Sequence, residues 1–270
     1  MSSGLPVETA DFLQTHPVFS LDEAARALKP AGGRDAAFER LMYYVEKGRL
    51  KPVSRGVYAT VPPGTDPRKF RPDRFLVAAS VRPDAVFCYH AALELLGAAH
   101  SEWTRCDLFT RRRRPPLVTD GFRLEFLTAP PPFRARRAAL GVREVDRLGR
   151  LLRLTGPERT LAEGLRRPDR VGGLEELVES AAGFPTLDLR LLRRILRAYD
   201  ERSLWAVVGW FLETHQKAFA VPQGYLVGLA RHRPASPQYV LRDHRGGSLL
   251  KRWNLIVPDS LLRRGEPDGP

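Results

Sequence analysis

The residues of this chain that are best suited to chemistry are arginines, and the densest run lies near the middle of the sequence. Within Arg111–Arg114, the side chains of Arg112, Arg113 and Arg114 are our candidate phosphate contacts. Guanidinium groups bind phosphate oxygens through paired, charge-assisted hydrogen bonds, and each contact to a nucleic-acid backbone adds to the salt dependence of binding. More arginines follow in the same region: Arg134, Arg136, Arg137, Arg143, Arg147, Arg150 and Arg153. We therefore predict that this region contacts a phosphate backbone, the alternative being a solvated loop and an exposed face in an arginine-rich protein.

The net charge also favours a polyanionic partner. The 270 residues include 44 Lys and Arg and 31 Asp and Glu, which makes a formal net charge of +13. Residues 63–155 hold eighteen basic and ten acidic residues, whereas residues 1–62 hold eight and seven. A basic surplus of this kind is typical of proteins that bind nucleic acid. Only six of the basic residues are lysines, however, and a GC-rich genome would produce such an arginine bias without any function.

A second set of candidate contacts lies on a predicted helix over Arg34–Lys47. Its apolar residues Phe38, Leu41, Met42 and Val45 recur at helical spacing, which predicts a core-facing stripe centred on Phe38 and Val45. The opposite face then presents four candidate DNA contacts: Ala36, Arg40, Tyr43 and Lys47.

These four residues suit a major groove. Arg40 is placed to bind a guanine edge or a phosphate, and Ala36 to touch a thymine methyl group. Lys47, near the end of the helix, is expected to meet the DNA backbone. The alternative is that Arg40 and Lys47 are ordinary solvated charges on a surface helix.

The elements around this helix predict a winged helix-turn-helix. A short helix over Val7–Thr15 comes first. Ser20 then opens a second helix and has, with Glu23, the S-x-x-E spacing of a capping box. Two extended runs follow the third helix, Leu50–Val53 and Val57–Val61, which together are typical of a β-hairpin. Three short helices and a hairpin, in this order, make up the predicted module.

Three further candidate contacts lie on the other elements of this module. Ser20 and the first amides of the second helix are expected to bind a phosphate, because helix N-termini attract anions. Arg55, at the tip of the hairpin, is placed to enter a minor groove or meet a phosphate. Lys51 lies on the strand that leads to this tip.

We divide the chain at the proline-rich stretch Pro62–Pro67. Residues 1–62 are predicted to form the DNA-binding domain, and residues 68–270 an α+β domain with a helical C-terminal part. Helices of this second domain are predicted at residues 72–81, 90–96, 174–182, 189–199, 204–215 and 222–231. Asp188 and Ser203 are expected to cap two of them. Extended runs are predicted at residues 106–110, 122–128, 151–155, 238–241 and 253–257.

The sequence offers little for catalysis. The six histidines and two cysteines lack the spacing of a metal site, and His90 is interpreted as a cap or core residue. The segment Gly246–Ser248 resembles the turn of a nucleotidyltransferase, but Leu261 and Leu262 stand where Asp259 would need a second carboxylate to hold metal. A restriction-like nuclease domain would need an acid-x-Lys strand, and none lies beyond the hairpin. We therefore expect no enzyme activity, no metal and no cofactor.

The same sequence features predict where the protein resides. The longest apolar run, around Leu204–Leu212, is shorter than the roughly 20 residues that cross a bilayer. The N-terminus carries Glu8 and Asp11 and lacks the apolar region of a secretory signal. Cys88 and Cys106 do not form a disulfide framework. We expect a soluble cytoplasmic protein without a membrane partner.

Four stretches of the sequence, in this order, carry a family resemblance: Gly48-Arg49-Leu50 with Val53–Ala59, Tyr89–Gly97, Thr155–Leu161 and Lys251–Val257. The third reads T-G-P-E-R-T-L and is followed by Glu163, where the related pattern has an aspartate. Together these stretches span nearly the whole chain. They resemble the AbiEi family of transcriptional regulators, the antitoxins of type IV toxin–antitoxin systems linked to abortive phage infection.

The resemblance implies a function. A protein of this family binds repeats in its own promoter through the winged helix and represses transcription. It also has a cognate toxin of the nucleotidyltransferase type, which it counters without stable binding. Three alternatives stay open: a solitary regulator without a toxin, a winged-helix module that neutralises a partner directly by protein contact, and a winged helix fused to a restriction-like nuclease domain.

Overall fold

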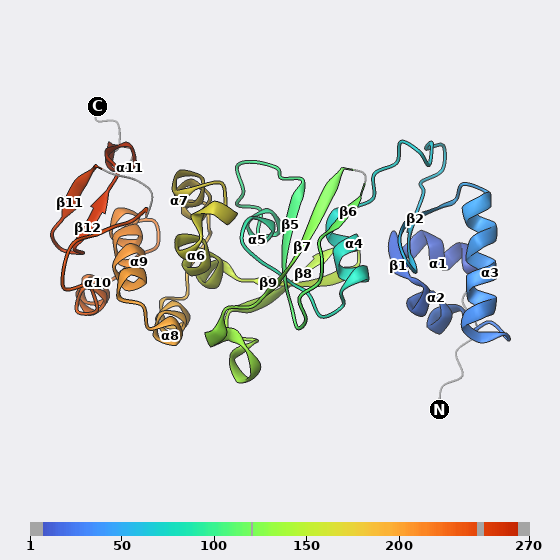
Figure 1. Ribbon diagram of the computed structural model, residues 1–270, viewed down its shortest axis with the longest axis horizontal. Coiled ribbons are helices and arrows are strands. Elements are labelled where there is room, and N and C mark those ends of the chain that lie inside the picture. The colour runs from blue at the N-terminus through green and yellow to red at the C-terminus, as the bar shows by residue number, and fades with distance from the viewer. Residues whose placement is uncertain (1–7, 120, 242–245, 264–270) are drawn as a thin grey trace. The chain divides into compact units, whose positions relative to one another are not determined.

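The computed structural model describes residues 8–119, 121–241 and 246–263. Over these residues the chain is an α+β protein with three separate sheets, which confirms the predicted class (Figure 1). No helix in the described ranges is long and apolar enough to cross a membrane. Backbone contacts divide the chain into a first unit, Met1–Val86, Thr104–Thr128 and Glu144–Arg153, and a second unit, Phe87–Trp103, Ala129–Arg143 and Leu154–Pro270.

The first unit begins with a small module of three helices and a three-stranded sheet. Its elements are α1 (Thr9–Thr15), β1 (Val18–Ser20), α2 (Leu21–Leu28), α3 (Gly33–Glu46), β2 (Leu50–Ser54) and β3 (Val57–Thr60). We call these elements the N-terminal module. Strand β3 lies between β1 and β2 and is antiparallel to both. A shared core of aromatic and aliphatic residues, including Phe12, Phe19, Leu41 and Tyr58, joins the helices to the sheet.

Local signals in the sequence explain where these elements start and stop. The predicted capping box is confirmed, because the Glu23 amide donates to Ser20 Oγ at 3.2 Å and the Ser20 amide donates to the Glu23 carboxylate at 2.7 Å. Gly48 follows α3 with φ of 66°, and Gly56 turns the hairpin with φ of 69°. Both angles lie in the left-handed region that glycine adopts without steric strain.

The predicted orientation of α3 is wrong at Phe38, which leaves 44% of its surface exposed. The residues of α3 that are fully buried are Ala37 and Leu41, while Val45 is half-buried. Ala37, Leu41 and Val45 recur at i, i+4 and i+8, so they fit the helical period as well as the stripe through Phe38 does. The small Ala37 side chain allows the helix to pack closely on the module core, and the larger Phe38 is left at the edge of the packed face.

Helix α4 (Arg74–Val81) continues the first unit and packs against β1 and β3. Asp73 caps it by accepting hydrogen bonds from the amides of Phe75 and Leu76. Three strands follow: β5 (Arg105–Thr110), β6 (Leu117–Thr119) and β7 (Phe122–Thr128). Strand β7 lies between β6, to which it is antiparallel, and β5, to which it is parallel.

A hairpin of β8 (Val142–Arg147) and β9 (Arg150–Thr155) contributes two arginines that tie the first unit together. Arg147 donates two hydrogen bonds to one carboxylate oxygen of Asp73, the cap of α4, at 2.7 and 2.9 Å. Arg150 donates to Ser80 Oγ at 2.6 Å and to the Glu23 carboxylate at 2.9 Å. The N-terminal module is therefore held to α4 and to this hairpin by specific polar contacts.

The second unit is mainly helical. It contains β4 (Val86–Phe87, at its boundary), α5 (His90–Leu95), α6 (Pro157–Arg166), α7 (Leu174–Ala182), α8 (Leu189–Tyr199), α9 (Arg202–Thr214), α10 (Gln223–Ala230) and α11 (Asp259–Arg263). Strand β9 lies between β8 and the parallel β4. Helix α6 contacts α7, α8 and α9 and is buried along most of its length. A small sheet follows, in the order β10 (Gln238–Tyr239), β12 (Leu255–Val257), β11 (Ser248–Leu250).

Two of the predicted caps have different outcomes. Asp188 caps α8 as expected, because its carboxylate accepts from the amides of Arg190 and Leu191. The cap predicted at Ser203 is wrong, since α9 already begins at Arg202 and has Glu201 at its N-cap. The Trp205 amide donates to the Glu201 carbonyl, so Ser203 lies inside the first turn of the helix, whose buried residues start at Leu204.

Candidate nucleic-acid interface

The exposed face of α3 centres on Tyr43, which keeps 55% of its surface accessible. The ammonium of Lys47, one turn further on, lies 5.6 Å from the centre of the Tyr43 ring. The Tyr44 ring meets Tyr43 edge-on with centroids 5.4 Å apart. Ala36 is half-buried, and Arg40 is exposed but donates to Thr9 Oγ1 of α1 at 3.3 Å. Tyr43 and Lys47 are thus the candidate residues that project most clearly from this helix.

The charge of α3 is balanced rather than strongly positive. Its exposed basic residues are Arg34, Arg40 and Lys47, and its exposed acidic residues are Asp35, Glu39 and Glu46. Arg34 is also paired with Asp22 of α2 at 2.8 Å, in a setting open to solvent. This helix therefore offers hydrogen-bonding groups and an aromatic ring, but little net attraction for a polyanion.

The start of α2, where Ser20 was selected, is occupied by internal hydrogen bonds. The Ser20 hydroxyl accepts from the Glu23 amide, and the Leu21 amide donates to the Gly56 carbonyl at 2.8 Å. The same turn carries the carboxylates of Asp22 and Glu23. A phosphate approaching Ser20 would meet these negative charges, so the helix dipole is already balanced from within the protein.

Lys51 and Arg55, the two candidate residues on the β2–β3 hairpin, differ in whether their side chains bind other parts of the protein. Lys51 Nζ donates to the Phe70 carbonyl at 2.9 Å and is half-buried, which ties this side chain to the loop after the module. Arg55 is exposed at the hairpin tip, and in the part of the chain that the structure describes its side chain has no hydrogen-bonding partner. Arg55 is therefore the hairpin residue that remains available for a phosphate.

The run Arg111–Arg114 forms an exposed loop between β5 and β6, which we call the arginine loop. Three hydrogen bonds fix its backbone at two points, the Arg112 carbonyl and the Arg111 amide. Thr110 Oγ1 donates to the Arg112 carbonyl at 2.9 Å, Arg82 Nη1 donates to the same carbonyl at 3.3 Å, and the Arg111 amide donates to Asp84 at 2.9 Å. No side chain of the run has an ion-pair partner among the described residues. The loop thus presents unpaired guanidinium groups from a fixed backbone.

Arg82 and Asp84 form the support of this loop, and neither was singled out from the sequence. Their fork-to-fork pair has two contacts of 2.7 Å, and Arg82 is almost fully buried. The Arg82 guanidinium, together with the Arg111 amide, holds the pKa of Asp84 down at about 2, against the opposing effect of burial. The R-P-D sequence of residues 82–84 allows an ion pair between Arg82 and Asp84. The sequence does not show that this pair supports the arginine loop, because the contact between the pair and the loop joins distant segments.

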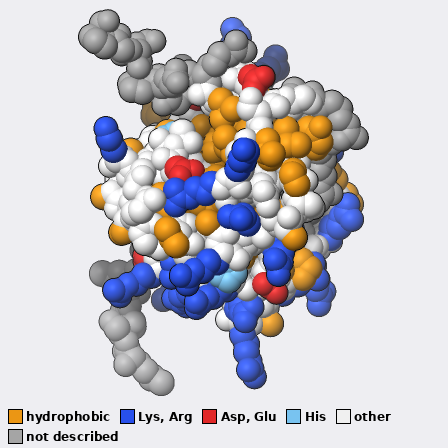
Figure 2. Space-filling view, turned by 90° about the vertical axis from the view of Figure 1, so that its left-hand side faces the viewer, with side chains coloured by type: hydrophobic (Ala, Val, Ile, Leu, Met, Phe, Trp, Pro, Cys, Tyr) orange, Lys and Arg blue, Asp and Glu red, His pale blue; other side chains and the backbone are white. Residues whose placement is uncertain are grey.

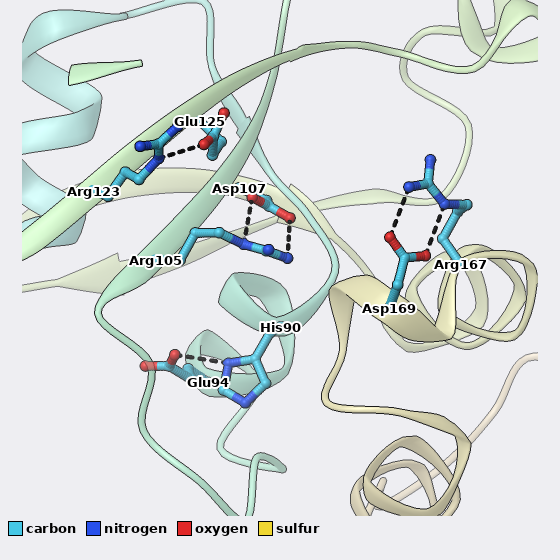
Figure 3. A network of polar contacts seen from close by, with 8 residues as sticks. All are labelled: His90, Glu94, Arg105, Asp107, Arg123, Glu125, Arg167 and Asp169. Atoms are coloured by element: carbon cyan, nitrogen blue, oxygen red, sulfur yellow. Dashed lines mark hydrogen bonds and ion pairs between the residues drawn. The ribbon is translucent and has the colours of Figure 1, made fainter. Parts of the chain in front are cut away.

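Other arginines of the first unit are paired along the strands. Arg105 lies 3.2 Å from Asp107 on β5, and Arg123 pairs with Glu125 on β7 (Figure 3). The register places Arg105 beside Arg123 and Asp107 beside Glu125. These guanidinium groups are neutralised within the sheet, so within the first unit the arginine loop holds the densest group of unpaired guanidinium groups.

In the second unit, His90 is a core residue, which was one of the two roles predicted for it, a helix cap or a core histidine. Its Nδ1 lies 2.9 Å from the Glu94 carboxylate (Figure 3) and its Nε2 lies 3.2 Å from Ser101 Oγ. Its ring stacks on Trp103 at 4.2 Å, and Ser101 donates to Glu176 at 3.0 Å. This chain of contacts fastens the loop after α5 to α7. No group of histidines, cysteines and carboxylates suited to a metal ion is found among the described residues.

Over the described residues the protein is thus an α+β protein of two units, and the first unit presents unpaired arginine side chains at the hairpin tip and in the arginine loop. Its fold resembles that of the RV2827C protein from Mycobacterium tuberculosis, known from a crystal structure, with a TM-score of 0.61. The match covers 94% of this chain and 92% of that chain at 17% sequence identity, which shows a shared fold. No protein-family model and no curated protein matches the sequence.

Proposed function

We propose that this protein is a sequence-specific DNA-binding transcriptional regulator whose N-terminal module is a winged helix-turn-helix. The order α1, β1, α2, α3, β2, β3, with β3 central in an antiparallel sheet, supports this assignment. In such a module α3 is the recognition helix and the β2–β3 hairpin is the wing. The observation that carries the proposal is the position of Tyr43 and Lys47, which project from α3 on the side away from its core contacts.

The arginine loop supplies the positive charge that α3 lacks. Because α3 carries balanced charges, it contributes selectivity, and the electrostatic share of the affinity must come from elsewhere. The arginine loop is anchored to Arg82 just after α4. Arg147 of the β8–β9 hairpin binds Asp73 at the start of α4, and Arg150 of the same hairpin binds both Ser80 of α4 and Glu23 of the N-terminal module. Loop and recognition helix therefore belong to one connected framework, in which base contacts and backbone contacts act together.

The regulator is further proposed to act as an autorepressing antitoxin of the AbiEi type in the cytoplasm. The support is the ordered set of sequence stretches. Three of these stretches contribute interior residues of the second unit, namely His90 on α5, Arg159 on α6 and Trp253 before β12. The burial of these residues supports a structural role for the three stretches, which the proposal extends to the family they resemble. On this proposal the operator is the protein's own promoter, and a nucleotidyltransferase-type toxin is countered without stable binding.

A second candidate function has its own support. Phe38 and Tyr43 expose apolar surface on α3 beside the carboxylates of Glu39 and Glu46. Aromatic residues are enriched in protein–protein interfaces, and DNA would be repelled by these carboxylates. The alternative is therefore a winged-helix module that neutralises a partner protein by direct contact.

Binding of the full chain to DNA from upstream of its own gene distinguishes the two functions. We expect a saturable gel shift that resists unrelated competitor DNA. Lys47→Ala should reduce the slope of log K against log salt by about 1, and Arg40→Ala should weaken specific binding by about 1–3 kcal/mol. Lys69→Ala, which removes the same charge from an exposed loop residue, is the matched control.

A different pair of results would contradict the DNA-binding proposal. If the upstream DNA gives no shift, and a protein that co-purifies with the chain is released by Phe38→Ala, the DNA-binding proposal is wrong and the interaction module is correct. Release of such a partner by Lys47→Ala alone would not separate the two functions, so Phe38 is the residue of choice.

A further inference from the structure

A cavity of about 590 Å³ lies on the second unit, between α8 and the short 3-10 helix Ala135–Arg137. Four of the side chains that line it are arginines: Arg136, Arg137, Arg194 and Arg197. No acidic side chain lines it, and the remaining lining is apolar, with Leu140 and Leu191 as its largest members. We call this cavity the arginine pocket.

The four guanidinium groups have no compensating charge. All four side chains are exposed, and within the described residues none has a hydrogen-bonding or ion-pair partner. Other arginines of the same unit are paired: Arg166 with Glu201 at 2.6 Å and Arg167 with Asp169 at 2.7 Å. Helix α8 carries no carboxylate along its length, and its cap Asp188 is engaged by backbone amides. Like charges gathered around one cavity repel each other, and an anion bound among them relieves that repulsion.

One wall of the arginine pocket is built on a buried cation. Arg159 of α6 is 1% exposed, and its Nη1 donates to the carbonyls of Leu140 at 3.0 Å and Ala138 at 3.3 Å. Its guanidinium carbon lies 4.2 Å from the centre of the Phe133 ring. A Cβ on Gly141, which has φ of 69°, would lie only 2.9 Å from Arg159 Cβ. The segment that lines the cavity is therefore held in place before any ligand arrives.

The surface character of the second unit fits an anionic ligand. Figure 2 views the end of the molecule that carries the C-terminal elements, and Lys and Arg side chains are far more numerous there than Asp and Glu. A generally basic surface attracts many polyanions, whereas a cavity selects by size. The volume of about 590 Å³ falls within the roughly 300–1,000 Å³ that pockets for small molecules occupy.

We propose that the arginine pocket binds a small molecule with several linked phosphates, of the nucleoside triphosphate class. Paired guanidinium–phosphate hydrogen bonds suit four arginines that line one cavity, because such side chains can share the oxygens of a short polyphosphate chain. Leu140 and Leu191 offer apolar contact to the rest of such a molecule. All the residues that line the arginine pocket belong to the second unit, so this proposal does not rest on the DNA contacts proposed for α3 and the arginine loop.

Calorimetric titration of the full chain with ATP, tripolyphosphate and AMP tests the proposal. We expect ATP and tripolyphosphate to bind with one site per chain and AMP to bind at least about tenfold more weakly, because it lacks the linked phosphates. Arg194→Ala/Arg197→Ala should weaken ATP binding by about tenfold or more. Arg190→Ala, an exposed residue of α8 outside the pocket lining, should leave it within about twofold.

Comparing the affinities for ATP and tripolyphosphate also identifies which part of the ligand is recognised. Tighter binding of ATP than of tripolyphosphate supports a nucleotide, and equal binding supports a polyphosphate chain as the recognised part. The proposal is overturned if neither binds at millimolar concentration, or if Arg190→Ala weakens binding as much as the double variant. It is also overturned if the double variant affects only DNA binding, which would make the pocket part of a nucleic-acid surface. An ATP-induced rise in melting temperature, lost in the double variant, gives an independent readout of the same site.

Discussion

Two buried arginines in different units carry out the same structural task in different surroundings. Arg82 of the first unit holds the backbone of the arginine loop, and Arg159 of the second unit holds the segment that lines the arginine pocket. Each is paired with a carboxylate, Asp84 or Glu163. In both regions one neutralised, buried arginine supports a segment whose own arginines are left unpaired.

The two carboxylates nevertheless respond in opposite ways. The carboxylate of Asp84 is partly open to solvent, and its pKa is lowered to about 2 by Arg82. Glu163 is fully buried, and its pKa is raised because the loss of hydration outweighs the attraction of Arg159 and the hydrogen bond from Tyr199. The comparison teaches that access to water, rather than the presence of an arginine, decides which protonation state the fold favours.

Removing Arg159 is expected to have the largest effect. Arg159→Met deletes the bonds to two carbonyls and leaves Glu163 buried without its cation, at a cost of about 3 kcal/mol in the free energy of unfolding. Arg159→Met/Glu163→Gln should recover much of this loss, because the buried carboxyl group that loses its partner is also removed. Urea denaturation of both variants measures the difference. A double variant as unstable as the single one would show that the carbonyl contacts, and not the ion pair, carry the stability.

A smaller effect is expected from the glycine that packs on Arg159. Gly141→Ala places a methyl group in a left-handed backbone and against Arg159, so we expect a loss of about 2 kcal/mol. Gly149→Ala in the β8–β9 turn is the matched control, because its φ is also positive at 82° and its added Cβ meets no atom within 4 Å. Equal losses in thermal unfolding would mean that backbone strain alone acts at residue 141.

The pH dependence of stability separates the two carboxylates directly. Since the pKa of Asp84 is lower in the folded chain, its contribution is complete above the ordinary value of 3.8 and is lost as the pH falls toward 2. Since the pKa of Glu163 is raised, its contribution is complete below the ordinary value of 4.5 and is lost as the pH rises. Asp84→Asn should therefore flatten the acid side of the stability curve, by less than about 1 kcal/mol because solvent screens the pair. Glu163→Gln should flatten the rising side, and the same change of slope in both variants would contradict the comparison.

The smallest effect on stability, under about 0.5 kcal/mol, is expected for Arg112→Ala/Arg113→Ala/Arg114→Ala, since these exposed side chains have no partners within the described residues. The same variant should lower DNA affinity and reduce the salt slope by about 2–3. A matched control, Arg190→Ala/Arg202→Ala/Arg231→Ala, removes three exposed charges from the second unit. Unchanged affinity and slope in the first variant would remove the arginine loop from the proposed interface.

Much of the secondary structure was predictable because its signals are local. The capping box at Ser20, the cap at Asp188 and the glycine after α3 depend on residues within one turn of each other. Strand β1 was not predicted, because it has only three residues and is defined by pairing with β3, which lies beyond two helices in the sequence. Strands β6 and β8 were not predicted although their partners β7 and β9 follow directly, because both are largely exposed and lack the alternating apolar pattern of a half-buried strand. The candidate contacts on α3 were only partly separable, since two apolar stripes fit the same helical period.

By itself, the sequence determined several helix ends, the α+β class and the existence of an arginine surplus, because these follow from local capping signals, periodicity and composition. Only the tertiary structure decided which arginines are paired and which are free. The sequence alone does not distinguish Arg159 from Arg194. In the structure Arg159 is buried and paired with Glu163, whereas Arg194 lines a cavity that has no acidic side chain. The physical reason is that pairing and burial depend on residues that folding brings together from distant segments, and local sequence signals do not specify which segments meet.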